Sequence, residues 1–153
     1  MKKFALVTGA SSGIGLQICH SLAKRGFNII LTSRSENTLK VVSEKISYKY
    51  EVETTYFPCD LADKQGPQNI FNFCESKNYQ VNILVNNAGY ALPNSFEENS
   101  VEDEEKCIRV LATSVISLTK LFVRDMIKNN SGKIMIVSSV AAFAPPAAIQ
   151  VMY

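Results

Sequence analysis

The stretch TGASSGIG, residues 8–15, is the part of the chain that indicates how the rest is arranged. It follows an apolar run, residues 4–7, and precedes a helix-like segment with apolar residues at Ile14, Ile18 and Leu22. A strand, a glycine turn and a helix in this order are typical of a phosphate-binding loop. Glycines let the backbone approach a pyrophosphate closely, and a helix N-terminus offers it free N–H groups. The alternative is an ordinary strand-to-helix turn rich in glycine and serine.

The composition is ordinary for a soluble globular domain, because 46% of the 153 residues are apolar and 20% are charged. The length predicts one domain, residues 1–153, with a sizeable core. The net charge of +2 comes from scattered basic residues, which disfavours a nucleic-acid-binding surface. No stretch approaches the ~18 apolar residues of a membrane span. The apolar run after Lys2 and Lys3 is too short for a signal peptide.

The cysteines Cys19, Cys59, Cys74 and Cys107 are far apart and form no CxxC pair. This pattern predicts free thiols in a reducing compartment rather than a disulfide framework or a metal site. We therefore expect a cytoplasmic protein without a bound metal. The single histidine, His20, falls in the first predicted helix, away from the expected site, and is interpreted as an ordinary helix residue.

Apolar runs alternate with helix-like segments along the chain. Continuous apolar runs are typical of strands buried on both faces, whereas apolar residues three or four apart indicate helices. We predict strands at residues 4–8, 27–32, 52–57, 81–85 and 133–137. The first predicted helix spans about 14–24, and the second runs to about 49 from a cap at Ser35 or Asn37. The third begins near Pro67. The fourth spans 101–129 and carries on one stripe Cys107, Leu111, Ser114, Leu118 and Leu121 or Phe122.

This alternation predicts right-handed βαβ units and a doubly wound, Rossmann-type parallel α/β sheet. In such a sheet, ligands bind outside the carboxyl ends of the strands. Polar or glycine residues follow every predicted strand, so we expect a binding site along this edge. These residues are the glycine loop, Arg34, Asp60, the segment 86–89 and Ser139.

With these residues in place, the chain resembles the short-chain dehydrogenase/reductase family over residues 4–153. The glycine loop matches the family's TGxxxGxG cofactor motif, and residues 86–89 match its NNAG motif. Asp60 and Leu61 match a pair that contacts adenine, although Asp60 alternatively caps the following helix. The resemblance implies the strand order 3-2-1-4-5, truncated after strand five, because the remainder of the family pattern is absent.

The resemblance also implies a nicotinamide dinucleotide cofactor. Arg34 stands where NAD-preferring members carry an acid, and its guanidinium offers a fork of donors to a 2′-phosphate. Arg34 therefore favours NADP over NAD, and the alternative is a solvated loop arginine. The hydroxyls of Ser11, Ser12 and Ser33 are additional donors. The expected cofactor-binding residues are Gly9, Ser11, Ser12, Gly13, Ile14, Gly15, Arg34, Asp60, Leu61, Asn87, Ala88 and Gly89.

Ser139 and Tyr153 resemble the family's substrate-positioning serine and its catalytic tyrosine, which donates a proton to the substrate oxygen. A free tyrosine has a pKa of about 10, and the family lowers it with a lysine four residues later, a position this chain does not reach. The spacing between Ser139 and Tyr153 is one residue longer than usual, so Met152 lies at the usual distance from Ser139. The alternative interpretation of Tyr153 is a frayed terminal residue. Leu111 occupies the place of an asparagine that holds a relay water, and leucine cannot hydrogen-bond water.

Two functions compete on these residues. The first is an NADP-dependent oxidoreductase of small-molecule carbonyls or alcohols. Because similar enzymes are homo-oligomers, the resemblance implies a homo-oligomer for this chain too. The second is a truncated, inactive NADP-binding or interaction protein, as Leu111 and the missing lysine suggest. A P-loop nucleotidase is disfavoured because no GK[ST] sequence closes the glycine loop. The substrate is not named by the sequence, because one fold supports many reactions.

Overall fold

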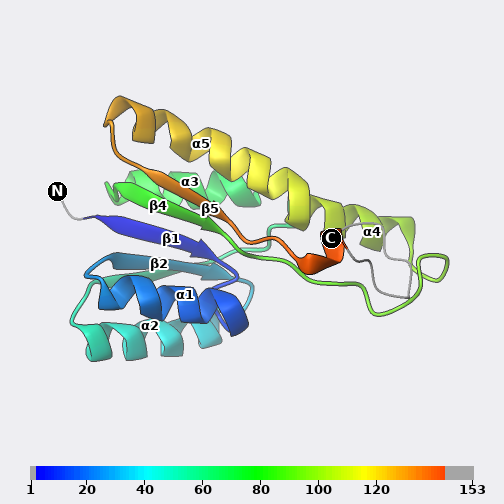
Figure 1. The fold of residues 1–153 in the computed structure, drawn as a ribbon, viewed down its shortest axis with the longest axis horizontal. Coiled ribbons are helices and arrows are strands. Elements are labelled where there is room, and N and C mark those ends of the chain that lie inside the picture. The colour runs from blue at the N-terminus through cyan, green and yellow to red at the C-terminus, as the bar shows by residue number, and fades with distance from the viewer. Residues whose placement is uncertain (1–2, 144–153) are drawn as a thin grey trace.

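The computed structural model describes residues 3–143. Strands and helices alternate along this part of the chain, as Figure 1 shows. The strands are β1 (Phe4–Thr8), β2 (Asn28–Ser33), β3 (Thr54–Pro58), β4 (Val81–Asn86) and β5 (Lys133–Ile136). The helices are α1 (Gly13–Lys24), α2 (Glu36–Tyr50), α3 (Gly66–Ser76), α4 (Val101–Ile108), the π-helical turn η1 (Arg109–Thr113), α5 (Ser114–Lys128) and the 3₁₀ turn η2 (Val140–Ala142).

The five strands form one parallel sheet in the order β3-β2-β1-β4-β5. Helices α1 and α2 lie on one face of the sheet, and α3 and α5 lie on the other (Figure 1). Thr8 at the end of β1 pairs with Thr32 of β2, and Val7 pairs with Val85 of β4, so these strands end at nearly the same level. The predicted doubly wound sheet and its strand order are therefore confirmed.

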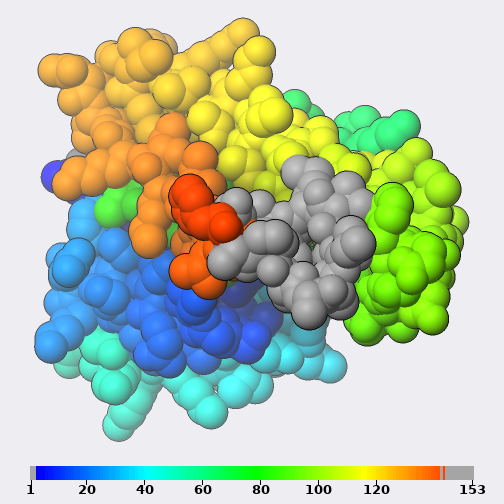
Figure 2. Space-filling model, turned by 45° about the vertical axis from the view of Figure 1, so that its right-hand side comes forward, coloured from blue at the N-terminus to red at the C-terminus, as the bar shows by residue number. Residues whose placement is uncertain are grey.

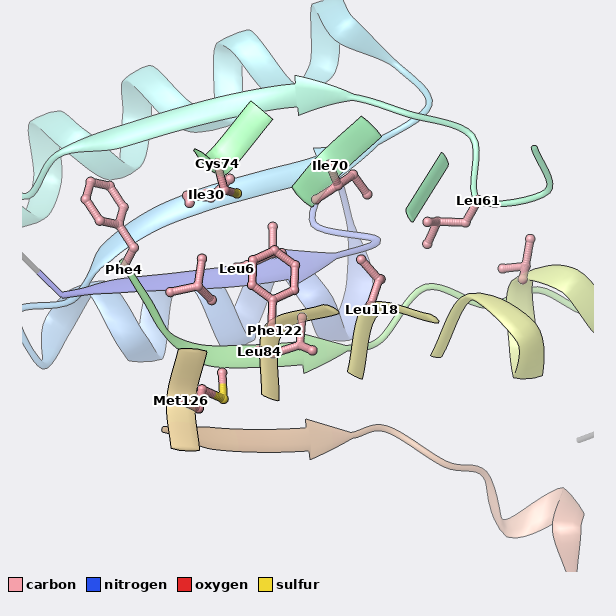
Figure 3. Packing of buried hydrophobic residues seen from close by; sticks show 12 residues of the cluster. Phe4, Leu6, Ile30, Leu61, Ile70, Cys74, Leu84, Leu118, Phe122 and Met126 are labelled. Atoms are coloured by element: carbon pink, nitrogen blue, oxygen red, sulfur yellow. The ribbon is translucent and has the colours of Figure 1, made fainter. Parts of the chain in front are cut away.

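The alternating side chains of β1 divide the core into two halves. Ala5 and Val7 pack with buried residues of α1 and α2, whereas Phe4 and Leu6 pack with those of α3 and α5. In Figure 3, Leu6 and Phe122 of α5 lie close together in the second half. Full burial of one such leucine or phenylalanine stabilises the fold by about 1.5–3 kcal/mol, so these two layers hold the strand ends firmly in place.

Local backbone geometry explains where the first helices begin and end. Gly26 takes a left-handed conformation after α1 (φ 82°), and its N–H donates to the Ala23 carbonyl at 2.9 Å. Ser35, not Asn37, caps α2, because its hydroxyl accepts from the Thr38 N–H at 3.4 Å. These contacts confirm the predicted end of the first helix and decide between the two caps proposed for the second.

Strand boundaries differ from the prediction by one or two residues. β3 begins at Thr54 rather than at Val52, because Glu51 ends α2 in a left-handed conformation (φ 54°) and the chain must then turn into the sheet. β2 is shifted by one residue relative to the prediction, and β4 extends one residue further than predicted. β5 ends at Ile136, although the Val137 N–H still donates to the Asn86 carbonyl at 2.9 Å.

The prediction of one regular helix over residues 101–129 is wrong, because the π-helical turn η1 separates α4 from α5. A π-helical turn accommodates an extra residue and rotates the helix face that follows it. Val110, rather than Leu111, is buried in the stripe that runs from Cys107 through Ser114 and Leu118. The Ser114 hydroxyl donates to the Val110 carbonyl at 2.8 Å, so this buried polar group is satisfied inside the helix.

β5 is an edge strand with little cover on either face. Ile134, Met135 and Ile136 are 37%, 48% and 58% exposed, and successive side chains point to opposite faces of a sheet. Figure 2 shows the atoms of β5, in orange, at the surface between α5 and α1.

Among residues 3–143, no helix is long and apolar enough to cross a membrane.

Candidate functional site

A cleft of about 570 Å³ lies at the carboxyl ends of the first four strands. Parallel strands end at the same edge of a sheet, so the loops that follow them meet there. Every residue expected to bind the cofactor lines this cleft: Gly9, Ser11, Ser12, Gly13, Ile14, Gly15, Arg34, Asp60, Leu61, Asn87, Ala88 and Gly89. The fold therefore brings together four segments that are far apart in the sequence.

Two glycines allow the glycine loop and α1 to approach the end of β4. Gly9 has a φ of 65°, and a Cβ built on it would lie 2.9 Å from the Cα of Ala88. A Cβ on Gly15 would collide with the Gly9 carbonyl oxygen and with Nδ2 of Asn87. Larger residues at these two positions would push the loop away from its neighbours, so the shape of the cleft depends on the missing side chains.

Thr8 connects the end of β1 to the NNAG segment. Its hydroxyl is buried and accepts from the N–H groups of Asn87 and Ala88, each at 2.9 Å. It also donates to the Val85 carbonyl at 3.3 Å. In return, Nδ2 of Asn87 donates to the carbonyls of Thr8 at 2.9 Å and of Gly9 at 3.4 Å. The sequence analysis gave the Thr8 side chain no role, although its position at a strand end within the motif was a signal.

The N-terminus of α1 lines the cleft with unsatisfied donors. Ser12 is the N-cap residue, but its side chain makes no capping hydrogen bond, and the first turn contains no acid. The first N–H groups of a helix lack partners within the helix, and its dipole places positive charge there. Ile14 is 64% exposed in this turn, so its expected place on one apolar face with Leu22 is wrong. Its backbone belongs to an end that suits a phosphate.

The end of β2 supplies further donors. The hydroxyls of Thr32 and Ser33 line the cleft and have no hydrogen-bond partner there. Arg34 follows on the rim with an exposed side chain, and no carboxylate of residues 3–143 forms an ion pair with it. The exposed guanidinium at this strand end provides charge-assisted donors of the kind that a phosphate group requires.

Asp60 and Leu61 lie at the end of β3. The Asp60 carboxylate accepts from the Ala62 N–H at 2.9 Å and so closes its own loop. The interpretation of Asp60 as a helix cap is wrong, because α3 begins only at Gly66. Leu61 is 7% exposed and belongs to the core while also lining the cleft (Figure 3). This segment therefore presents a carboxylate and an apolar side chain side by side.

The expected catalytic residues do not line this cleft in the described structure. Ser139 is exposed after β5, and its hydroxyl accepts from the Ala141 N–H at 3.1 Å as the cap of η2. Tyr153 lies outside the described residues. Leu111 packs on the NNAG segment, because a Cβ on Gly89 would lie 2.9 Å from its Cδ2. An apolar side chain thus fills the place where the resemblance leads one to expect an asparagine.

Five residues that were not predicted from the sequence as part of the site also line the cleft: Thr32, Ser35, Cys59, Tyr90 and Val110. Tyr90 directly follows the NNAG segment, which was the available signal. Burial, together with the negative charges of Asp60 and Asp63, raises the pKa of the Cys59 thiol to about 11, so this thiol stays protonated at neutral pH. The four cysteines of the chain are unpaired, as predicted.

The sheet and its strand-end cleft define a Rossmann-type α/β protein. The chain belongs to the short-chain dehydrogenase family, because the family's sequence profile, described as "short chain dehydrogenase", matches residues 3–153. The resemblance that the motifs indicated is therefore confirmed. Among residues 3–143, no group of metal-ligating side chains is large enough to hold a metal ion.

Named relatives place the chain more closely within the family. It is 35% identical to very-long-chain 3-oxoacyl-CoA reductase of Bos taurus, and the match covers 94% of this chain and 46% of that protein. It is 34% identical to the 3-oxoacyl-[acyl-carrier-protein] reductase FabG of Aquifex aeolicus, over 92% of this chain and 57% of that one. The chain thus spans about half the length of the curated relatives it matches.

A solved structure confirms the fold. L-sorbose reductase of Gluconobacter frateurii, crystallised with NADPH and L-sorbose, superposes with a TM-score of 0.90 at 28% identity. The superposition covers 96% of this chain and 56% of that protein.

Proposed function

We propose that this chain binds NADP(H) and takes part in hydride transfer between the nicotinamide and a carbonyl or alcohol substrate. The observation that carries the proposal is the single cleft that joins the glycine loop, the NNAG segment and Arg34. The NADPH of the structural neighbour and the 3-oxoacyl reductases among the relatives support it. The free cysteines support a reducing compartment such as the cytoplasm.

The residues of the cleft fit such a dinucleotide. The uncapped N-terminus of α1 and the glycine loop would hold the pyrophosphate. Arg34 and Ser33 would hold a 2′-phosphate, and Asp60 with Leu61 would contact the adenine. The bound nicotinamide supplies the hydride. Ser139 would orient the substrate oxygen, and Tyr153 would donate a proton to it, because hydride addition to a carbonyl carbon leaves charge on the oxygen.

A titration of both cofactors tests the preference for NADP. We expect Arg34→Ala to weaken NADPH binding by about ten- to a hundredfold, because a charge-assisted hydrogen bond contributes ~1.5–3 kcal/mol. The affinity for NADH should change little. Arg25→Ala is the matched control, since Arg25 is an exposed arginine that does not line the cleft. Equal NADPH-to-NADH ratios in the wild type and in Arg34→Ala would contradict the proposal.

The second candidate is a binding protein without catalysis, and the packing of Leu111 against Gly89 favours it. General acid–base catalysis contributes ~10²–10⁴-fold, and a relay water has no hydrogen-bonding partner at a leucine side chain. We therefore expect the 153-residue chain to bind NADPH without measurable turnover. Steady consumption of NADPH with a panel of ketones and aldehydes would exclude this candidate and support the enzyme.

A further inference from the structure

Tyr90 provides the only aromatic side chain among the described residues that line the cleft. It directly follows Gly89, and its side chain is neither buried nor fully exposed, with 37% of the residue accessible. A large apolar surface at the mouth of a polar cleft costs free energy unless something covers it. The exposed part of Tyr90 gives the cleft an aromatic surface on which a planar ring can pack.

The backbone of Tyr90 is anchored to the helix behind it. Its carbonyl accepts a hydrogen bond from Sγ of Cys107, a buried residue of α4, at 3.7 Å. Leu111 of η1 packs against Gly89, which leaves no room for a side chain there. These two contacts hold residues 89 and 90 against α4 and η1. The backbone from which the Tyr90 ring projects is consequently fixed by the fold.

The surroundings of the ring place it near the ends of β2 and β3. Nε of Arg109 in η1 donates to the Ala62 carbonyl at 3.0 Å, so η1 lies against the loop that follows β3. The charges of Asp60, in that loop, and of Arg34, at the end of β2, also act on the phenol. Burial, with the charges of Cys107 and Asp60, raises the pKa of the Tyr90 phenol, so the ring is neutral at physiological pH. Ser139 does not line this part of the molecule. Tyr90 thus belongs to the end of the cleft that Arg34 and Asp60 define.

We propose that the ring of Tyr90 packs against the adenosine half of the dinucleotide and determines part of the affinity for that half. The inference rests on the proposed function and adds a residue to it. Leu61 and Val110 are the buried apolar side chains of the same cleft, so a purine there would meet apolar surface from more than one element. Packing of a base on an aromatic ring depends on the ring face and is insensitive to a hydroxyl group.

Two ligands and three variants test the proposal by calorimetric titration. The ligands are NADPH and adenosine 2′,5′-bisphosphate, which lacks the nicotinamide half. We expect Tyr90→Ala to weaken both by about tenfold, within the range of base–aromatic packing. Tyr90→Phe keeps the ring and should bind both ligands as the wild type does. Phe96→Ala is the matched control, because Phe96 is an exposed aromatic residue outside the cleft and should have no effect.

The outcomes separate the inference from the function on which it rests. Unchanged binding of the bisphosphate by Tyr90→Ala would overturn the inference, as would a loss confined to NADPH. An equal loss in Tyr90→Phe would assign the effect to the hydroxyl and also overturn it. The melting temperature of ligand-free Tyr90→Ala should match that of the wild type, and a large decrease would show a structural role instead. Failure of the wild type to bind either ligand would reject the proposed function itself.

Discussion

Thr8 is the single residue on which two loops of the cleft depend. Its hydroxyl is the acceptor for two backbone N–H groups, those of Asn87 and Ala88. Thr8→Val keeps the shape of the side chain but removes this acceptor. We expect the free energy of unfolding to fall by about 1–3 kcal/mol for each N–H left unsatisfied. Urea denaturation measures the change, and Thr8→Ser, which keeps the hydroxyl, is the control. Equal stability of the two variants would contradict this role.

Cys19 of α1 and Cys74 of α3 are buried in different halves of the core. Burial raises the pKa of the Cys19 and Cys74 thiols from 9.0 to about 12. Between these values a thiol ionises only in the unfolded chain, so the unfolded state gains stability as the pH rises. We expect the free energy of unfolding to fall above pH 9 by about 1.4 kcal/mol per pH unit for each thiol.

Urea denaturation at about pH 8 and about pH 10 tests whether the two buried thiols cause this pH dependence of the free energy of unfolding. The loss of stability between the two conditions should be smaller in a variant that combines Cys19→Ala and Cys74→Ala. Alanine cannot ionise, so the variant removes the linkage while leaving the helices in place. The same loss in the variant and in the wild type would show that other groups cause it.

At the scale of the whole molecule, β5 is an edge strand of the sheet among residues 3–143. Three of its four residues, Ile134, Met135 and Ile136, are apolar and exposed, and an apolar edge strand is a template for pairing with another chain. Ile127 of α5 adds exposed apolar surface to the same region, where a groove runs between α5 and β5. We therefore expect the purified chain to self-associate through β5.

Analytical ultracentrifugation over a range of concentrations measures this association. Ile134→Lys and Ile136→Lys place charges on the edge and should shift the chain towards a monomer. Val41→Lys is the control, because Val41 is an exposed apolar residue on α2, away from the edge. A stable monomer of the unmodified chain at high concentration would contradict the expectation.

Much of this architecture is local in origin and could be predicted from sequence. Continuous apolar runs such as residues 4–7 are typical of strands buried on both faces, and the alternation of strands and helices allows few topologies. The residues that line the cleft could also be predicted, because the carboxyl ends of parallel strands lie along one edge of the sheet. The boundary of β3 could not be predicted, since it depends on the left-handed conformation of Glu51.

The pattern of residues along the chain decided the fold, the edge that carries the cleft and the segments that line it. The tertiary structure alone decided which side chains within those segments meet. The buried hydroxyl of Thr8, the burial of Val110 in place of Leu111, and the ring of Tyr90 in the cleft are the clearest cases. The physical reason is that hydrophobic periodicity is set by neighbours along the chain, whereas hydrogen bonds and close packing depend on atoms brought together from distant elements.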